Sequence, residues 1–301
     1  MDKRFTIVLP AYNYRRFLGR ALDSVFAQEG EDFSVLVVDD GSTDGTREFL
    51  QQEYRGRLDY LHQKHRCPNS AAIRGVRESR SEFIIFMAGD DQLVPGMMQK
   101  LRAVLGKRPD VDLVCGRTCP VTKDGRKKHP KALSIHHDPL QNFLSYILGK
   151  FPVSPCGAAF RRSFLQPYLI DGKLPKSYDT LILAHALLGG NCSIQEEVFV
   201  EVHDHDGRFR NHLPSVQSEG HEIVDMMFAP KWVGDSLELQ SLQSSYHARI
   251  STERGRNFYQ AGSFREAWQC YHDAFSTDFR FACTPRNLRR YLVGWLRTLL
   301  A

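Results

Sequence analysis

The chain has 301 residues, of which 42% are hydrophobic and 25% are charged, and its net charge is +5. These values are typical of a globular chain with one large or two smaller domains, and they exclude a disordered, collagen-like or disulfide-stapled protein. The mild basic excess does not indicate nucleic acid binding, although it is compatible with an anionic substrate or a membrane surface. The seven cysteines are an odd number, and we expect no secretory leader at the start of the sequence. No apolar stretch approaches the ~20 residues of a spanning helix. We therefore expect a cytoplasmic protein that does not cross a bilayer.

Short apolar strands alternate with helices through the first part of the sequence. Four β-rich runs are each followed by a segment with helical spacing of apolar residues, and these runs occupy residues 5–9, 33–38, 58–62 and 83–87. The alternation predicts an α/β fold with a mainly parallel sheet between helices. In such sheets, ligands bind beyond the carboxyl ends of the strands.

Polar residues gather at those carboxyl ends. The first strand is followed by residues 10–13, the second ends in Asp39 and Asp40, and the fourth is followed by Asp90 and Asp91. A single Asp-Asp pair is typical of a solvated turn. Two such pairs at one rim of a sheet repel each other, however, and need a cation or hydrogen-bond donors from a ligand. We therefore interpret this rim as a ligand site.

The rim lacks the usual phosphate-binding sequences. No G-x-G-x-x-G follows the first strand, and no P-loop lysine signature occurs in the chain. A divalent metal held by a carboxylate can instead bridge a diphosphate, neutralise it and stabilise it as a leaving group. The remaining carboxylates would accept hydrogen bonds from a base N–H or from ribose hydroxyls.

The chain resembles the family 2 inverting glycosyltransferases of the GT-A fold in three successive segments: IVLPAYNYRRFLGRALDSVFAQ (7–28), VVDDGSTDGT (37–46) and FIIFMAGDDQLVPGMM (83–98). The resemblance extends from residue 5 to about residue 205. It implies that the loop after the first strand lines the nucleotide pocket, that the acid pair after the second strand includes the carboxylate that contacts the base, and that the acidic motif after the fourth strand contacts ribose and metal. The implied nucleotide-sugar-binding residues are Pro10, Ala11, Tyr12, Asn13, Asp39, Asp40 and Asp90, and the implied metal ligand is Asp91.

The sequence departs from the family pattern at two places. The family commonly reads Asp-x-Asp-Asp at the acidic motif, whereas Ala88 occupies the first of these positions here. Asp91, with Asp90 beside it, is left to hold the metal. Upstream, Ala72 and Ile73 stand where the family usually has an Arg-Asn pair. Both departures bear on the identity of the donor rather than on the fold.

The resemblance also implies a catalytic base in the second half of the domain, as an acid that opens a helix with a glycine eleven residues on. Asp179 opens such an apolar segment, Gly190 stands eleven residues after it, and Tyr178 replaces the Glu that usually precedes the acid. Inversion at the anomeric carbon needs a carboxylate opposite the leaving diphosphate, to take the proton of the acceptor hydroxyl. The alternative is a helix-capping role for Asp179, and the two roles are compatible.

A strand predicted over residues 198–207 ends in two histidines and two acids. The resemblance aligns His203 with a histidine that follows the last sheet strand of the family and sometimes reaches the metal or the diphosphate. The alternative is a surface histidine without such a role.

The sequence beyond about residue 220 predicts helices only. A helical hairpin spans residues 258–274, and a terminal helix opens at Thr284 and Pro285. One face of this helix is apolar and consists of Leu288, Tyr291, Leu292, Trp295, Leu296 and Leu299. Arg286, Arg290 and Arg297 lie opposite, and together with Arg289 they make the segment basic, with no acid. The pattern is that of an interfacial helix attracted by anionic lipid, although docking on the body of the protein or on a partner is equally compatible.

We therefore predict a GT-A catalytic domain at residues 1–220 and a helical C-terminal region at residues 221–301. The predicted activity is metal-dependent inverting transfer of a hexosyl or N-acetylhexosaminyl group from a nucleotide-diphosphate donor, a UDP-sugar being favoured, to a hydroxyl of a lipid-linked or growing surface polysaccharide. The expected cofactor is Mn²⁺ or Mg²⁺, with Asp91 and His203 as ligands. The alternative is a non-catalytic nucleotide-sugar-binding subunit of a polysaccharide assembly complex. The inner membrane face and a second copy of the chain stay open as partners, whereas nucleic acid is not expected.

Overall fold

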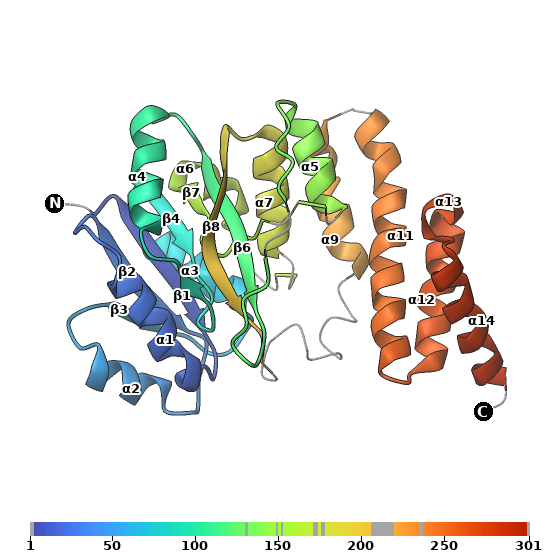
Figure 1. Cartoon of the computed structure of the whole chain (residues 1–301), viewed down its shortest axis with the longest axis horizontal. Helices are drawn as coiled ribbons and strands as arrows, with labels where there is room; N and C mark the ends of the chain where they lie inside the picture. Colours follow the sequence, from blue (N-terminus) through green and yellow to red (C-terminus); the bar gives the residue numbers. More distant parts are fainter. Residues whose placement is uncertain are drawn as a thin grey trace. The chain divides into compact units, whose positions relative to one another are not determined.

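The computed structural model describes residues 3–129, 132–148, 150–151, 153–170, 174–175, 178–205, 220–234 and 237–299. The chain divides into two compact units, an α/β unit over Met1–His205 and a helical unit over Asp206–Ala301 (Figure 1). The sequence predicts this boundary near residue 220, and residues 206–219 lie outside the described part of the chain.

Strands and helices alternate in the first part of the α/β unit, where the sequence predicts them. They are β1 (Phe5–Ala11), α1 (Arg15–Phe26), β2 (Phe33–Asp39), α2 (Thr46–Glu53), β3 (Asp59–His62), α3 (Pro68–Glu78), β4 (Phe83–Phe86), β5 (Gln92–Leu93) and α4 (Met97–Lys107). The later elements are β6 (Leu113–Val121), α5 (Pro139–Ile147), β7 (Ala159–Arg161), α6 (Arg162–Leu165), η1 (Gln166–Tyr168), α7 (Tyr178–Gly189) and β8 (Cys192–His203).

The strands of the described residues form one eight-stranded sheet in the order β3-β2-β1-β4-β7-β6-β8-β5. The four strands β3, β2, β1 and β4 are parallel, as the alternation of strands and helices predicts. In the other half, β6 and β8 are parallel, whereas β7 is antiparallel to both β4 and β6, and β5 is antiparallel to β8. The sheet is therefore parallel in its first half and mixed in its second.

The parallel half brings the carboxyl ends of β1, β2 and β4 to one edge of the sheet. Ala11 pairs with Asp39 across β1 and β2, so the loops that follow these strands are neighbours. Pro10 lies within β1 rather than in the following loop. Its position is tolerated because the pairing of β1 with β4 ends at Val8, so that the N–H that proline lacks has no ladder partner there.

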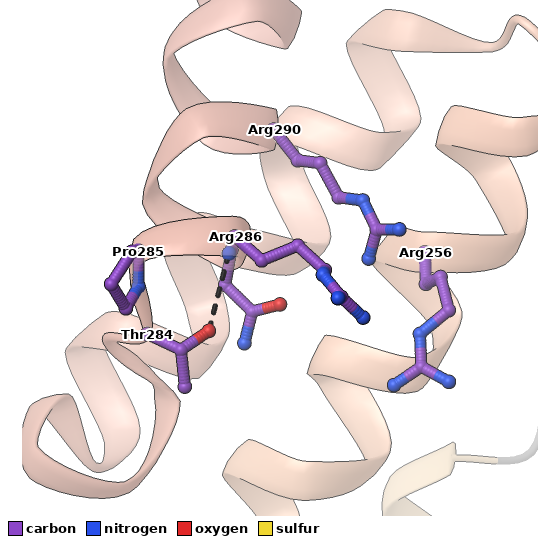
Figure 2. A pocket seen from close by; sticks show the side chains of 6 residues that line it. Arg256, Thr284, Pro285, Arg286 and Arg290 are labelled. Carbon is purple, nitrogen blue, oxygen red and sulfur yellow. Dashed lines mark hydrogen bonds between the residues drawn. The ribbon is translucent and has the colours of Figure 1, made fainter.

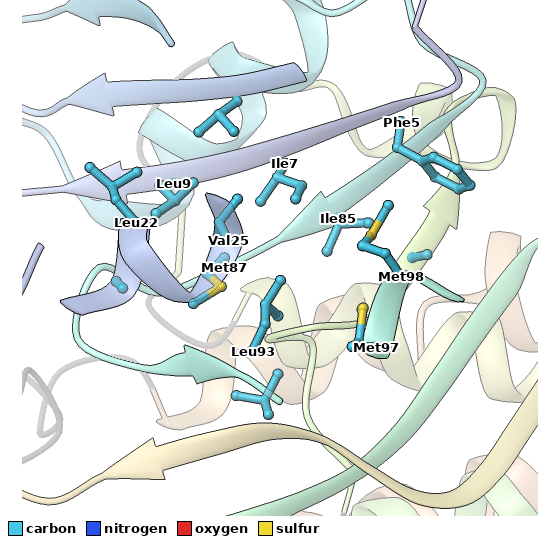
Figure 3. Packing of buried hydrophobic residues seen from close by; sticks show 14 of the residues in the cluster. Phe5, Ile7, Leu9, Leu22, Val25, Ile85, Met87, Leu93, Met97 and Met98 are labelled. Carbon is cyan, nitrogen blue, oxygen red and sulfur yellow. The ribbon is translucent and has the colours of Figure 1, made fainter. Parts of the chain in front are cut away.

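A hydrophobic core fixes the helices that lie against this half of the sheet (Figure 3). Phe5, Ile7 and Leu9 alternate along β1, are fully buried, and pack in one cluster with Leu22 and Val25 of α1. The alternation follows from the two-residue period of a strand, which sends every second side chain to the same face.

Helix α3 approaches the sheet closely at Gly75. A Cβ atom at this position would lie 2.3 Å from Cγ1 of Val8 on β1. The absence of a side chain therefore lets the helix backbone pack against the strand, and this packing holds the N-terminus of α3 beside the rim.

The helical unit contains α9 (Gly220–Met227), α10 (Pro230–Val233), α11 (Leu237–Gln260), α12 (Phe264–Thr277), α13 (Phe279–Ala282) and α14 (Pro285–Leu299). Helices α11 and α12 form the hairpin, and Gly262 between them adopts φ +80°, a left-handed conformation that favours glycine. None of the helices in the described part of the chain is long and apolar enough to span a membrane.

Helix α14 packs on α12 through Gly294 and Tyr291 rather than through its leucines. A Cβ at Gly294 would lie 3.0 Å from the carbonyl oxygen of Phe264 and 3.2 Å from Cβ of Trp268. The leucines of the apolar face consequently face outward, and Leu292, Leu296 and Leu299 expose 45%, 50% and 65% of their surfaces.

Candidate active site

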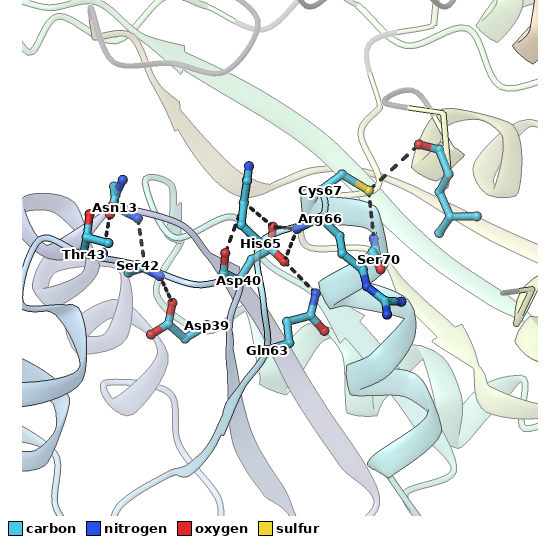
Figure 4. Close-up of polar contacts among 11 residues, drawn as sticks. Asn13, Asp39, Asp40, Ser42, Thr43, Gln63, His65, Arg66, Cys67 and Ser70 are labelled. Atoms are coloured by element: carbon cyan, nitrogen blue, oxygen red, sulfur yellow. Dashed lines mark hydrogen bonds and ion pairs between the residues drawn. The ribbon is translucent and has the colours of Figure 1, made fainter. Parts of the chain in front are cut away.

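Hydrogen bonds join the loop after β1 to the loop after β2. The backbone N–H of Asn13 donates to Oγ of Ser42 at 2.9 Å, and the N–H of Thr43 donates to Oδ1 of Asn13 at 2.8 Å (Figure 4). Asn13 has φ +55°, a left-handed conformation that asparagine tolerates better than most residues. These contacts fix the path of the chain just after Pro10, Ala11 and Tyr12.

Tyr12 presents an aromatic surface at this edge. Its side chain is 39% exposed, and its ring stacks on that of His65, with the ring centroids 3.8 Å apart and the planes 17° from parallel. The sequence singled out Tyr12 but not His65, because the two residues lie on loops after different strands. The stacked pair is a platform on which a nucleobase can pack.

Asp39 is buried, and both of its carboxylate oxygens accept hydrogen bonds from the protein. The N–H of Ser42 donates to Oδ1 at 2.8 Å, and the hydroxyl of Tyr60 donates to Oδ2 at 2.6 Å. Burial, together with this contact to Asp39, raises the pKa of Tyr60, so the phenol stays protonated and remains a donor. Asp39 therefore shapes the turn after β2.

Asp40 is also buried and organises the segment that leads into α3 (Figure 4). Its Oδ1 accepts from Nε2 of Gln63 at 2.6 Å and from the N–H of Arg66 at 3.0 Å, and its Oδ2 lies 2.9 Å from Nδ1 of His65. Asp40 thus holds His65 in place beneath Tyr12, which joins the acid pair to the aromatic platform.

The N-terminus of α3 connects this edge to the start of α7. The side-chain amide of Asn69 donates to the carbonyl of Pro175 at 2.8 Å, and Sγ of Cys67 contacts the carbonyl of Leu174 at 3.9 Å. Asn69 and Cys67 immediately follow the segment that Asp40 holds. The structure therefore ties the segment before Asp179 to the loops that follow β2 and β3.

Asp179 lies in the first turn of α7. Its Oδ1 accepts the N–H of Thr180 at 2.8 Å. Burial raises the pKa of the Asp179 carboxyl, although this hydrogen bond opposes the effect. A carboxylate with a raised pKa is a stronger base than an exposed aspartate, which suits it to proton abstraction.

Asp90 is held by a histidine that the sequence analysis did not choose. Nε2 of His205 lies 2.9 Å from Oδ2 of Asp90, and both side chains are buried. The ring of His205 packs on that of Phe17 at 4.0 Å, and the guanidinium of Arg20 donates to the Asp90 carbonyl at 3.0 Å. The His-x-His spacing at 203–205 could have indicated His205 as a second site residue, because alternate residues of an extended segment point to the same face.

Asp91 and His203 are brought together by the pairing of β8 with β6 and β5. The backbone N–H of His203 donates to Oδ1 of Asp91 at 3.1 Å, and the Asp91 side chain is almost fully buried. Nε2 of His203 is buried and has no hydrogen-bond partner among the described residues. Burial and the nearby charge of Arg20 lower the pKa of His203, which favours the neutral imidazole that ligates metals.

Cys156 is a further neighbour of this acid pair. Burial raises the pKa of its thiol well above the usual value, and the charges of Asp91 and Asp90 raise it further. The thiol therefore stays protonated beside the carboxylates, and its Sγ accepts the N–H of Ala88 at 3.4 Å. Cys156 occupies space near the position where the family commonly has another acid.

The residues present fit a divalent cation only in part. The described residues contain no group of three or more His, Cys, Asp or Glu side chains placed to hold a metal ion. A buried carboxylate and an unpartnered neutral imidazole are nevertheless suitable ligand types for a cation such as Mn²⁺. Asp91 and His203 would leave the other coordination positions to water and to a diphosphate.

The mixed sheet, with buried acids that follow β2 and β4, has the architecture of the GT-A fold. Residues 6–169, more than half of the chain, match the family model described as glycosyl transferase family 2. The chain therefore belongs to glycosyl transferase family 2 and is a glycosyltransferase.

Two curated relatives illustrate the range of similarity. An uncharacterised glycosyltransferase of Nostoc sp. (strain PCC 7120) is 23% identical over 290 residues, which cover 88% of this chain and 86% of the relative. Chondroitin synthase of Escherichia coli is 33% identical over 112 residues, which cover 36% of this chain but 16% of the synthase.

Solved structures show the same fold. Residues 1–349 of S. aureus TarS in complex with UDP-GlcNAc align with a TM-score of 0.69 and 19% identity, over 92% of this chain and 81% of that chain. The mannosyltransferase PcManGT from Pyrobaculum calidifontis, in complex with GDP-Man and Mn²⁺, aligns with a TM-score of 0.52 and 16% identity, over 99% of this chain and 81% of that chain.

Proposed function

We propose that the chain transfers a sugar, with inversion, from a nucleotide-diphosphate donor to a hydroxyl of a lipid-linked or growing surface polysaccharide. The observation that carries the proposal is the rim of buried carboxylates, Asp39, Asp40, Asp90 and Asp91, on a glycosyltransferase fold. Structural neighbours bind UDP-GlcNAc, UDP and GDP-Man, which supports a nucleotide-sugar donor, and a UDP-sugar is our favoured class.

In this proposal, the nucleotide lies across the ends of β1 and β2. The base packs on the platform formed by Tyr12 and His65, and its N–H donates to Asp40, which lies against that platform. Both oxygens of Asp40 already have partners within the protein, so the base N–H must replace or share one of these contacts. Asp90 accepts hydrogen bonds from the ribose hydroxyls while His205 holds its carboxylate in place.

Asp179 acts as the base. It takes the proton of the acceptor hydroxyl as the oxygen attacks the anomeric carbon, and the bond from that carbon to the diphosphate oxygen breaks on the opposite side. The contact of Asn69 with Pro175 positions the start of α7 for this role. Asp91 and His203 would hold the divalent cation, which, when bound, would supply positive charge to neutralise the diphosphate leaving group.

Release of nucleotide from a panel of UDP-, GDP- and other nucleotide-linked sugars, with and without Mn²⁺ or Mg²⁺, tests the activity. We expect turnover with one donor class that requires the cation. Turnover that is undiminished in the presence of EDTA would refute the metal requirement. Donor binding without turnover, over a broad panel of acceptors, would instead support the non-catalytic binding subunit.

Replacement of Asp91 tests the metal site itself. Asp91→Ala should abolish most of the Mn²⁺-dependent part of donor binding, as measured by calorimetric titration with UDP-sugar, because the variant loses the only charged ligand proposed for the cation. Asp124→Ala, which removes an exposed turn carboxylate in the same unit, is the matched control and should bind normally. Unchanged metal dependence in Asp91→Ala would place the cation elsewhere.

We further propose that the chain works in the cytoplasm, on the inner membrane face, where lipid-linked acceptors are found. The support is the row of exposed apolar side chains on α14, which includes Leu292, Trp295 and Leu296, together with the arginines of the same helix. Apolar side chains that enter the acyl boundary and cations that meet anionic lipid act together in interfacial helices.

Flotation with anionic vesicles tests this membrane proposal. The double variant Leu292→Glu and Leu296→Glu should lose vesicle binding, because it places two charges on the exposed face without disturbing buried contacts. Ile170→Glu, at an exposed apolar residue of the α/β unit, should float like the unaltered chain. If the double variant floats normally, the membrane proposal is wrong. If the unaltered chain sediments as a dimer without vesicles and the double variant sediments as a monomer, the face is a contact between copies.

A further inference from the structure

A cavity with three arginines in its lining lies within the helical unit, at the start of α14 (Figure 2). It is an open cleft of about 460 Å³, and α11 and the first turns of α14 provide its walls. Its lining residues are Arg256, Thr284, Pro285, Arg286, Asn287 and Arg290. The candidate active site contributes no residue to it, so the cavity calls for an explanation of its own.

Three guanidinium groups converge on this cavity. Arg286 and Arg290, one turn apart on α14, extend toward Arg256 of α11 (Figure 2). No carboxylate of the described residues forms an ion pair with any of the three. Arg290 instead contacts two aromatic residues: its Nη1 lies 3.5 Å from the hydroxyl of Tyr271, and its guanidinium lies 5.9 Å from the ring centroid of Tyr259. Three like charges gathered without a counter-charge repel one another, and a bound anion would remove that cost.

The backbone at the start of α14 adds to the positive potential. Pro285 has no N–H, the N–H of Asn287 donates to Oγ1 of Thr284 at 3.2 Å, and that of Leu288 donates to the Thr284 carbonyl at 2.9 Å. The N–H of Arg286 is left without a partner in the described part of the chain. The positive end of the helix dipole therefore lies at residues that line the cleft.

We propose that this cavity is a binding site for a phosphate group that carries two negative charges, such as a phosphomonoester or a terminal phosphate of a diphosphate. Guanidinium groups bind phosphate oxygens with paired N–H donors, and a tetrahedral anion can accept from several directions at once. A carboxylate offers only two oxygens in one plane and would leave part of this donor set unused. The site is independent of the donor site proposed in the α/β unit.

Titration of the full chain with inorganic phosphate, without divalent cations or donor, tests the proposal. Arg286→Gln and Arg256→Gln should each weaken phosphate binding about tenfold, a change of about 1.4 kcal/mol per variant. Arg289→Gln is the matched control: it removes the same charge from the same helix but lies outside the cavity, and its affinity should stay within about twofold. Phosphate should also raise the melting temperature of the unaltered chain and not that of the Arg256 and Arg286 double variant.

A second arm distinguishes a lipid headgroup from a soluble phosphate compound as the source of the group. Vesicles that contain phosphatidic acid present a phosphomonoester, and phosphatidylglycerol vesicles match their negative charge with a diester. Tighter binding to phosphatidic acid, lost in Arg286→Gln and kept in Arg289→Gln, identifies a lipid phosphate. Phosphate binding in solution without this lipid preference identifies a soluble ligand. Equal losses in Arg286→Gln and Arg289→Gln, or no phosphate binding in either arm, would overturn the proposal.

Discussion

Replacement of Asp179 by asparagine separates the proposed catalytic role from the structural one. The carboxylate lies in the first turn of α7, and its Oδ1 accepts the N–H of Thr180 at 2.8 Å. Asparagine has nearly the same shape and keeps a side-chain oxygen for this hydrogen bond, but it does not take up a proton at the pH of the reaction. A purely structural Asp179 would therefore tolerate the change well.

The expected effects on transfer and on stability have opposite signs. A positioned base contributes about 10²-fold or more to the rate. The rate of transfer should therefore fall by at least this factor, which corresponds to an increase of about 2.7 kcal/mol in the activation free energy. Burial raises the pKa of Asp179, which means that its ionised form is less favourable in the folded chain than in the unfolded one. That cost is present above the folded pKa and disappears as the pH falls through it. At pH 7, Asp179→Asn should consequently melt at the same temperature as the unaltered chain or above it.

The assay measures transfer and donor binding in parallel, together with thermal unfolding. Donor affinity should change little, because the carboxylate faces the acceptor in the proposed reaction. In the unaltered chain, kcat should fall as the pH is lowered through the pKa of Asp179, which lies above the usual ~3.9 of aspartate. Asp138→Asn is the control, since Asp138 caps α5 by accepting the N–H of Leu140 at 2.9 Å.

Two outcomes would refute this reasoning. Transfer within tenfold of normal in Asp179→Asn would show that another group is the base, and Asp204 would then be tested next. A large fall in melting temperature with a proportional loss of donor binding would show that the residue supports the fold rather than the chemistry.

Two substitutions test the packing that positions the rim. Tyr60→Phe removes the hydroxyl that donates to buried Asp39, and should lower the free energy of unfolding by about 1.5–3 kcal/mol in urea titrations at pH 7; a loss below about 0.5 kcal/mol would mean that water replaces the hydroxyl. Gly75→Ala places a methyl group against Val8 and should cost about 1–3 kcal/mol, although alanine is the better helix former. Gly106→Ala on α4, where a Cβ meets nothing within 4 Å, should raise the free energy of unfolding instead. If both glycine variants change the free energy of unfolding in the same direction, the packing explanation is wrong.

The sequence by itself determined the elements of the parallel half-sheet and the position of its acids. Apolar runs and helical spacing are local properties, so β1, β2, β3 and β4 could be predicted within a few residues. Because parallel strands end at one edge, the same reasoning placed Asp39 and Asp90 at a common rim. The family resemblance then added roles that no local pattern contains.

Only the tertiary structure decided which side chains support those acids. His205 reaches Asp90, and the N–H of His203 reaches Asp91, across more than a hundred residues, through the register of β8 against β6, which includes irregular steps near Arg117. Register between distant strands depends on the summed packing of both faces of the sheet. The register therefore cannot be predicted from the sequence of either strand alone.

The orientation of α14 was likewise undetermined until the packing was known. The sequence showed one apolar and one basic face, a pattern that fits burial of the leucines as well as their exposure. The structure packs the helix through Gly294, because the small residue lets α14 approach the backbone of Phe264 and the side chain of Trp268 on α12. Close backbone contact at the glycine thus turned the leucines outward and directed Arg286 and Arg290 into the cleft beside α11.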